Sequence, residues 1–295
     1  MRTLGLIALV LGLLVVTAVV APWVAAGLAA LGFEFKFSRV WNRVFEVLLV
    51  VGVGLLWRRL DLGRAADLGL VRAGWARDLG IGLAVGLAGM LTGLLVCWLG
   101  GGLVPQVRFP EPWKTVRKAL SGFAAAALVG GGEEVLFRGV LLRRLMADCG
   151  RAAGVVLVTA LYGVVHALHP SGSREAHASA GLDRLLTLFA PLGDPGVLPA
   201  IAGLAALGAV LAFARLRTAS LWIPVGIHAA VVSVFRVGRL FFHVRPKPAW
   251  LVGPGWPPLI GGVAGGVAVA TMLALLVVVL QRRRRATGAP LACPG

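Results

Sequence analysis

The sequence predicts an all-α protein, a polytopic bundle of transmembrane helices. Hydrophobic residues make up 59% of the 295 residues and charged residues only 14%, whereas about 25% of a soluble globular domain is charged. The mean hydropathy is +0.90. Several apolar stretches reach the roughly 20 residues that a helix needs to cross a bilayer. We therefore expect an integral membrane protein embedded in a lipid bilayer.

Eight stretches are apolar enough to form spans, and polar segments separate them. The connector 58–78 alternates leucines with Arg and Asp, which predicts a short amphipathic helix along the membrane interface. A polar loop is expected at 105–118, and a loop with one more interfacial helix at 169–195. The first stretch is longer than a signal-peptide core of about 7–15 residues, so it is expected to be retained. The expected spans are 4–31, 40–57, 79–104, 119–146, 152–168, 197–216, 221–242 and 260–280.

The net charge of +17 has two explanations, a nucleic-acid partner or membrane topology. The basic residues lie mostly in short segments between apolar stretches, and no nucleic-acid-binding motif accompanies them, so we exclude nucleic acid as a partner. Eight spans place both termini on one side. The arginine pairs 58–59, 143–144 and 215/217 and the run 282–285 share that side, which predicts cytoplasmic termini. Rich use of Arg, Ala, Gly, Leu and Val indicates a bacterial inner membrane.

These boundaries divide the chain into four segments. Residues 1–116 hold N-terminal transmembrane helices and the interfacial connector. A core at 117–243 carries the polar motifs described next. The last transmembrane helix lies within 244–281, and 282–295 form a basic tail. The sequence contains no internal repeat and no stretch typical of a soluble domain.

Two adjacent carboxylates interrupt the expected span 119–146, in the stretch GGGEEVLFRG at 130–139. Ionisable groups in hydrocarbon are costly and normally mark function. Glu134 and Arg138 are four residues apart, so they lie on one helix face and can form an ion pair. Glu133 points about 100° away from Glu134 and must find its partners on other helices. The spacing therefore predicts a structural pair beside a carboxylate that acts as a base.

Two histidines lie at membrane depth in later spans. His166 follows Tyr162 by four residues, on the same helix face, and His228 lies near the start of the span 221–242. Together with Glu133 they supply one carboxylate and two imidazoles from three helices. Such a carboxylate can deprotonate water, directly or with a bound metal, and an imidazole can donate a hydrogen bond to an oxyanion. These residue types predict hydrolysis at a site recessed within the bundle.

The order Glu-Glu-x-x-x-Arg, then aromatic-x-x-x-His, then a later His resembles the CPBP family, the CAAX-processing and bacteriocin-processing glutamic intramembrane proteases. The resemblance covers about residues 116–239, and EEVLFRG at 133–139 matches the first motif closely. It implies an endopeptidase that hydrolyses a peptide bond of a membrane-associated protein or peptide. Bacterial members are linked to bacteriocin maturation or immunity and to sorting signals, and eukaryotic members to prenylated proteins.

The resemblance also implies a role for each motif residue. Glu133 would be the general base that activates water, His166 would assist it, and His228 would stabilise the oxyanion. Glu134 and Arg138 would form the structural pair.

Two positions depart from the family pattern. Tyr162, in a supporting position, replaces the usual Phe. Val232 replaces the usual Asn, which is thought to help form the oxyanion hole, and valine cannot donate a hydrogen bond. Loss of one such donor typically lowers the rate about 10²–10³-fold. Either another group substitutes, such as Ser233 or Arg236, or the chain is a weakened or non-catalytic relative.

Two alternatives remain beside this hypothesis. Glu133, His166 and His228 are also a ligand set for zinc, but the zincin pattern His-Glu-x-x-His is absent from the sequence, so a mechanism without a cofactor is favoured. The competing function is a non-catalytic CPBP-like membrane protein that serves as an immunity factor, a scaffold or a transporter-like chain. Water activation requires the three side chains to converge within about 5 Å around one cavity.

Overall fold

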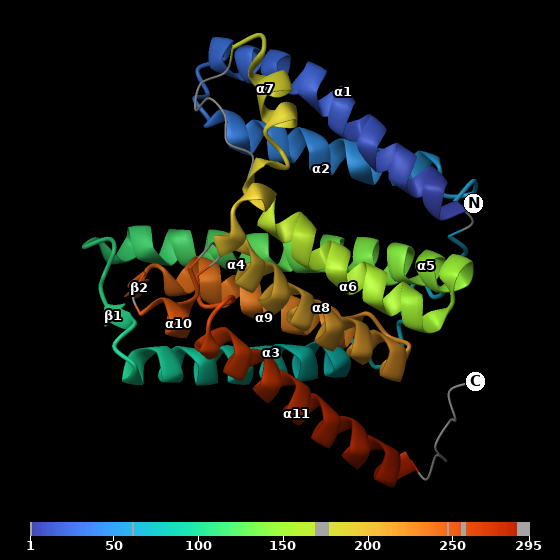
Figure 1. The fold of residues 1–295 in the computed structure, drawn as a ribbon, viewed down its shortest axis with the longest axis vertical. Coiled ribbons are helices and arrows are strands. Elements are labelled where there is room, and N and C mark those ends of the chain that lie inside the picture. Colours follow the sequence, from blue (N-terminus) through green and yellow to red (C-terminus); the bar gives the residue numbers. More distant parts are fainter. Residues whose placement is uncertain (1, 61, 169–176, 247, 255–257, 288–295) are drawn as a thin grey trace.

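The structure is a computed structural model, and it describes residues 2–60, 62–168, 177–246, 248–254 and 258–287. Helices make up nearly all of the regular structure, as the composition predicts (Figure 1). The helices are α1 (Arg2–Ala30), α2 (Phe37–Leu55), α3 (Trp75–Leu99), α4 (Pro112–Glu134), the π-helix η1 (Val135–Leu141), α5 (Leu142–Cys149), α6 (Arg151–Ala167), α7 (Ala180–Leu186), the 3-10 turns η2 (Ala190–Gly193) and η3 (Pro195–Val197), α8 (Leu198–Thr218), α9 (Trp222–Gly238), α10 (Ala249–Val252) and α11 (Val263–Thr287).

Helix α9 lies at the centre of the bundle. It packs against α3, α4 and α8, and residues 223–231 are all buried, as expected of a helix that is apolar on every side. Helix α6 packs on α8, and α11 crosses α3 diagonally (Figure 1). Helices α1 and α2 form a separate hairpin that α7 covers. The site residues of α4, α6 and α9 therefore come from neighbouring helices.

Small residues allow the helices around α9 to approach closely. A Cβ atom at Gly86 of α3 would lie 2.7 Å from Cβ of Ala230, and one at Gly130 of α4 would lie 3.0 Å from the backbone nitrogen of Ala229. Helix pairs in lipid gain stability mainly from van der Waals packing, which small residues permit. The contact at Gly130 brings the end of α4 next to His228.

Five helical segments are long and apolar enough to cross a membrane, which supports an integral membrane protein. They are Thr3–Ala30, Trp75–Leu99, Pro112–Cys149, Pro195–Thr218 and Val263–Arg285. The three remaining expected spans are weaker by length and composition. Helices α6 and α9 have only 17 residues each, and α2 carries three charged side chains, Arg39, Arg43 and Glu46.

The connectors differ from the sequence-based expectation in two places. No helix forms between residue 56 and α3 among the described residues, because Gly63 and Gly69 adopt φ angles of +71° and +95° that interrupt a helix. The expected loop 105–118 is shorter, since Pro112 begins α4, in accordance with the preference for proline in a first helical turn. Strand β1 (Leu103–Pro105) pairs antiparallel with β2 (Phe242–Val244), with Leu103 opposite Val244.

The motif helix is longer than the predicted 119–146. Helices α4, η1 and α5 follow one another without a break from Pro112 to Cys149. The seven residues of η1 come directly after Glu134. Such π-helical segments are rare and occur frequently at functional sites.

Candidate active site

Three helices bring Glu133, His166 and His228 together. Glu133 lies in the last turn of α4, His166 in the last turn of α6, and His228 in the first half of α9. Nε2 of His166 lies 2.9 Å from Oε2 of Glu133, and Nε2 of His228 lies 3.8 Å from the same oxygen. One ligand atom from each residue falls within 4.8 Å of the others. The three side chains therefore lie within the separation of about 5 Å that joint activation of one water molecule requires.

The partners of His166 define its protonation. Its Nδ1 lies 2.8 Å from the backbone carbonyl oxygen of Tyr162, one turn earlier on α6. A carbonyl only accepts, so Nδ1 carries a proton and Nε2 faces Glu133. The 2.9 Å contact between Nε2 and the carboxylate must also contain a proton. One exchangeable proton therefore lies between the carboxylate of Glu133 and the imidazole of His166, and groups in such contact can exchange protons with water.

Glu134 orients the second histidine. Nδ1 of His228 donates to Oε1 of Glu134 at 2.8 Å, which leaves Nε2 directed at Glu133 and Tyr162. The same Oε1 accepts from Nη1 of Arg138 at 2.9 Å. A buried carboxylate that accepts two charge-assisted hydrogen bonds is held as an anion. Glu134 therefore fixes the orientation of His228.

Arg138 is buried and contacts Glu134, the backbone of Gly208 and the ring of Tyr162. The side chains of Glu134 and Arg138 are fully buried, and Nη2 of Arg138 donates to the carbonyl of Gly208 in α8 at 3.1 Å. Its guanidinium lies 4.3 Å from the centre of the Tyr162 ring, a distance at which a cation is attracted to an aromatic face. These contacts tie α4, α6 and α8 together beneath the site.

Glu133 and His166 border a cavity of about 370 Å³. Their side chains are 32% and 24% exposed, whereas that of His228 is 3% exposed, so water can reach Glu133 while His228 stays buried. The cavity is lined by Val129, Glu133, Tyr162, His166, Leu204, Leu207, His228, Val231, Val232, Val234, Phe235, Arg236, Arg239, Phe242, Val244, Pro258, Leu259 and Ile260.

The cavity extends along α9 away from His228 toward β2. Arg236 and Arg239 line this outer part, together with Phe242 and Val244. Among the described residues that line the cavity, Glu133 is the single acidic one. The inner end of the cavity therefore carries the carboxylate, and the outer end carries guanidinium groups.

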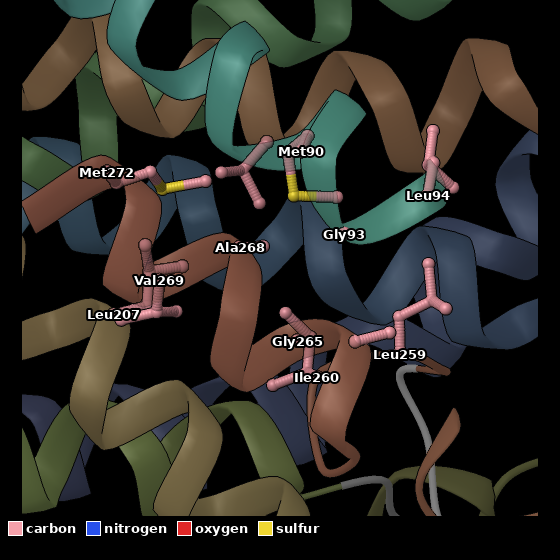
Figure 2. Close-up of a pocket in the computed structure, with 12 residues that line it drawn as sticks. Met90, Gly93, Leu94, Leu207, Leu259, Ile260, Gly265, Ala268, Val269 and Met272 are labelled. Atoms are coloured by element: carbon pink, nitrogen blue, oxygen red, sulfur yellow. The ribbon is translucent and has the colours of Figure 1, made fainter. Parts of the chain in front are cut away.

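A second, apolar cavity of about 10 Å³ lies between α3, α8, α9 and α11. Figure 2 shows Met90 of α3 and Ala268 and Met272 of α11 around it. A void of this size without polar partners does not hold water. Leu207, Val231, Leu259 and Ile260 line both cavities, so they form a hydrophobic wall behind the larger one.

Val232 and Ser233 supply no hydrogen-bond donor to the cavity, and the other described histidines, His177 and His243, lie outside it. Val232 lines the cavity and offers no hydrogen-bond donor there, and the buried Ser233 beside it is absent from the lining. His177 contacts Ser179 and Asp183, and His243 is exposed on β2. His169 lies outside the described residues.

The sequence interpretation missed two features of the site. It assigned Glu134 to Arg138 alone, whereas Glu134 also contacts His228. It also placed Arg236 only as a neighbour in sequence and did not consider Arg239. The spacing of four residues from His228 to Val232 and from Val232 to Arg236, and of three from Arg236 to Arg239, was visible in the sequence. The approach of α4 to α9 at Gly130, which brings Glu133 to these residues, was not.

A comparison with protein-family models agrees with this geometry. Residues 115–234 match the model described as type II CAAX prenyl endopeptidase Rce1-like, and this range contains Glu133, His166 and His228. No curated protein and no solved structure matches the chain. The family consists of peptidases, so the match implies a protease. Through residues 115–234, the chain carries an Rce1-like domain of the CPBP family.

Proposed function

We propose that the protein is an intramembrane endopeptidase that hydrolyses a peptide bond of a membrane-associated protein or peptide by glutamate- and histidine-activated water. The convergence of Glu133, His166 and His228 at the inner end of one cavity carries this proposal. The apolar lining between that end and the two arginines suits an extended apolar segment of a substrate.

Glu133 is the general base in this proposal. A water molecule beside Oε2 gives one proton to the carboxylate while its oxygen attacks the carbonyl carbon of the scissile bond. The π electrons of the carbonyl move onto its oxygen. When the intermediate collapses, the bond between carbon and nitrogen breaks, and the proton held by Glu133 and His166 passes to the leaving amine. His166 assists because its Nε2 contacts the same carboxylate oxygen.

His228 stabilises the oxyanion in this proposal. Its Nδ1 faces Glu134, so an imidazolium formed there is paired with a buried carboxylate. The Nε2–H group then points into the cavity near Glu133 and can donate to the developing negative charge. The relation of Glu134 to His228 thus resembles that of any carboxylate that orients a catalytic imidazole.

We propose that the reaction needs no metal. The two imidazole Nε2 atoms and the Glu133 carboxylate fit zinc by donor type, and the acceptors on both Nδ1 atoms are typical of zinc-bound histidines. The 2.9 Å contact between His166 and Glu133 has the length of a direct hydrogen bond. The expected result is that activity of the purified protein survives incubation with 1,10-phenanthroline. A loss that added zinc restores would instead establish a metal enzyme.

We also propose eight spans in a bacterial inner membrane, with cytoplasmic termini and the site recessed inside the bundle. Arginines at the ends of α5, α8 and α11 lie beside the connector 58–78. Arg143 donates to the carbonyl of Leu62 at 2.8 Å, and Arg283 pairs with Asp78 at 2.8 Å. This end, at which α1 begins and α11 ends (Figure 1), is rich in arginine, and arginine is enriched on the cytoplasmic side.

The experiment that tests the function compares the termini of membrane proteins in cells that contain the wild type or Glu133→Gln at matched abundance. Glutamine keeps the size of the side chain but cannot accept a proton from water. We expect specific new termini to be lost in Glu133→Gln and retained in Glu111→Gln, in which an exposed acid that pairs with Lys114 is neutralised. Unchanged termini in Glu133→Gln would reject catalysis and favour a non-catalytic immunity factor, scaffold or transporter-like protein.

A further inference from the structure

Tyr162 is the single tyrosine of the sequence, and its hydroxyl lies at the inner end of the larger cavity. The oxygen is 3.5 Å from Nε2 of His228. The residue lines the cavity although it is only 1% exposed. The backbone carbonyl of Tyr162 accepts a hydrogen bond from Nδ1 of His166, whereas its hydroxyl lies near His228. The hydroxyl is thus a donor that no step of the proposed mechanism has yet used.

The hydroxyl of Tyr162 and Nε2 of His228 are spaced so that both can donate to one shared acceptor atom. A separation of 3.5 Å exceeds the usual length of a strong hydrogen bond between the hydroxyl and the imidazole. An oxygen atom at about 2.8 Å from both groups would, however, accept from each at the same time. Nε2 of His228 also lies 3.8 Å from Glu133, so this position adjoins the water that Glu133 would activate.

The Tyr162 ring is held in place on several sides. Its centre lies 4.1 Å from that of His166 and 5.2 Å from that of Phe137, which meets it edge to face. The Arg138 guanidinium covers the ring at 4.3 Å. An oxyanion site is effective when its donors are fixed before the reaction, and these contacts provide such fixation.

Other side-chain donors in the cavity are less suitable. His166 directs Nε2 at Glu133. Arg236 follows His228 by eight residues, which corresponds to about 12 Å along a helix, and Arg239 lies further out. Val232, one turn from His228, has no donor. Among the described residues that line the inner end of the cavity, Tyr162 is therefore the remaining neutral donor beside His228.

We propose that Tyr162 is a catalytic residue whose hydroxyl, together with Nε2–H of His228, donates a hydrogen bond to the oxyanion of the tetrahedral intermediate. This inference rests on the proposed endopeptidase function. Tyr162 keeps its proton throughout. The water proton goes to Glu133 and His166 and passes to the leaving amine when the bond between carbon and nitrogen breaks, while the electron pair of the oxyanion re-forms the carbonyl. The tyrosine supplies the donor that Val232 lacks.

The test measures how fast new termini form after pulse labelling, in cells that contain wild type, Glu133→Gln, Tyr162→Phe or Ser233→Ala at equal abundance. The reporters are the termini that Glu133→Gln abolishes. Tyr162→Phe removes only the hydroxyl, and we expect it to slow their formation about 10²–10³-fold. Ser233→Ala removes a buried hydroxyl next to Val232 that does not line the cavity, and we expect the wild-type rate. Adding Val232→Asn to Tyr162→Phe should restore part of the rate.

The outcomes separate the two proposals. If Glu133→Gln abolishes the termini but Tyr162→Phe forms them at the wild-type rate, the tyrosine donor is rejected and the protease remains. If Glu133→Gln abolishes none, the proposed function itself fails. Thermal unfolding of the purified variants controls for packing. A slow Tyr162→Phe that also unfolds at a lower temperature, and that Val232→Asn does not rescue, would make Tyr162 a structural residue.

Discussion

Glu133 and Glu134 are neighbours in sequence but have different partners. Glu133 faces the cavity and His166, and Glu134 is enclosed by Arg138 and His228. One oxygen of Glu134, Oε2, has no hydrogen-bond partner among the described residues. A buried carboxylate needs a paired cation and hydrogen bonds, and Arg138 and His228 supply these contacts. The pair of Glu134 and Arg138 therefore contributes both to folding and to the orientation of His228.

Removing one member of that pair should be costly. Glu134→Gln leaves the buried Arg138 guanidinium without its carboxylate, and we expect a loss of about 3–5 kcal/mol in the free energy of unfolding, measured by thermal unfolding in detergent. The exposed pair Arg43–Glu46 supplies the control, since Glu46→Gln should cost less than about 1 kcal/mol. An equal loss in the free energy of unfolding in Glu134→Gln and Glu46→Gln would contradict a stabilising role of the buried pair. The double variant Glu134→Gln/Arg138→Met should unfold at a higher temperature than Glu134→Gln alone.

Sequence spacing predicted only some of the contacts that Glu134 and Tyr162 make. The interval of four residues between Glu134 and Arg138 predicted their contact, because both lie on one helix. The contact between Glu134 and His228 depends on where α4 crosses α9. Residue spacing within one helix does not predict where that helix crosses another. For the same reason the hydroxyl of Tyr162 could be placed near His166, on its own helix, but not beside His228.

Hydropathy predicted the helical elements better than it predicted their limits. Expected spans correspond to α1, α2, α3, α6, α8, α9 and α11. The motif span is longer than expected and contains η1, because the continuation of an apolar helix through a π-helical segment has no compositional signal. The amphipathic pattern of 58–78 predicted a helix wrongly, since backbone conformation at Gly63 and Gly69 decides that segment.

The crossing of α3 and α9 provides a prediction at the scale of elements. A methyl group at Gly86 would lie 2.7 Å from Cβ of Ala230 and 3.0 Å from Cα of Ile227, so Gly86→Ala must push the helices apart. We expect a loss of about 1–3 kcal/mol in the free energy of unfolding and slower proteolysis, because α9 carries His228. Gly80→Ala is the matched control on the same helix, where a Cβ meets nothing within 4 Å. A stability of Gly86→Ala equal to that of the control would show that the crossing is not tight.

The two ends of the whole molecule differ in what they contain. At one end α1 begins and α11 ends (Figure 1), and the arginines near Leu62 and Asp78 lie there too. The opposite end carries β1, β2 and the outer part of the larger cavity with Arg236 and Arg239. If the termini are cytoplasmic, the outer part of the cavity faces the other side of the membrane. The orientation of the chain therefore decides from which side a substrate enters.

Cysteine labelling tests this orientation directly. Cys149 is an exposed cysteine at the end of α5, and His243 is exposed on β2 at the opposite end. In variants that keep only Cys149 or only a cysteine from His243→Cys, a membrane-impermeant maleimide applied to intact bacterial spheroplasts should label His243→Cys and leave Cys149 unlabelled. Both should react after permeabilisation, which controls for accessibility. The reverse pattern would place the termini outside the cell and the outer part of the cavity in the cytoplasm. Substrates would then enter from the cytoplasm. The distribution of arginine would in that case have predicted the wrong orientation.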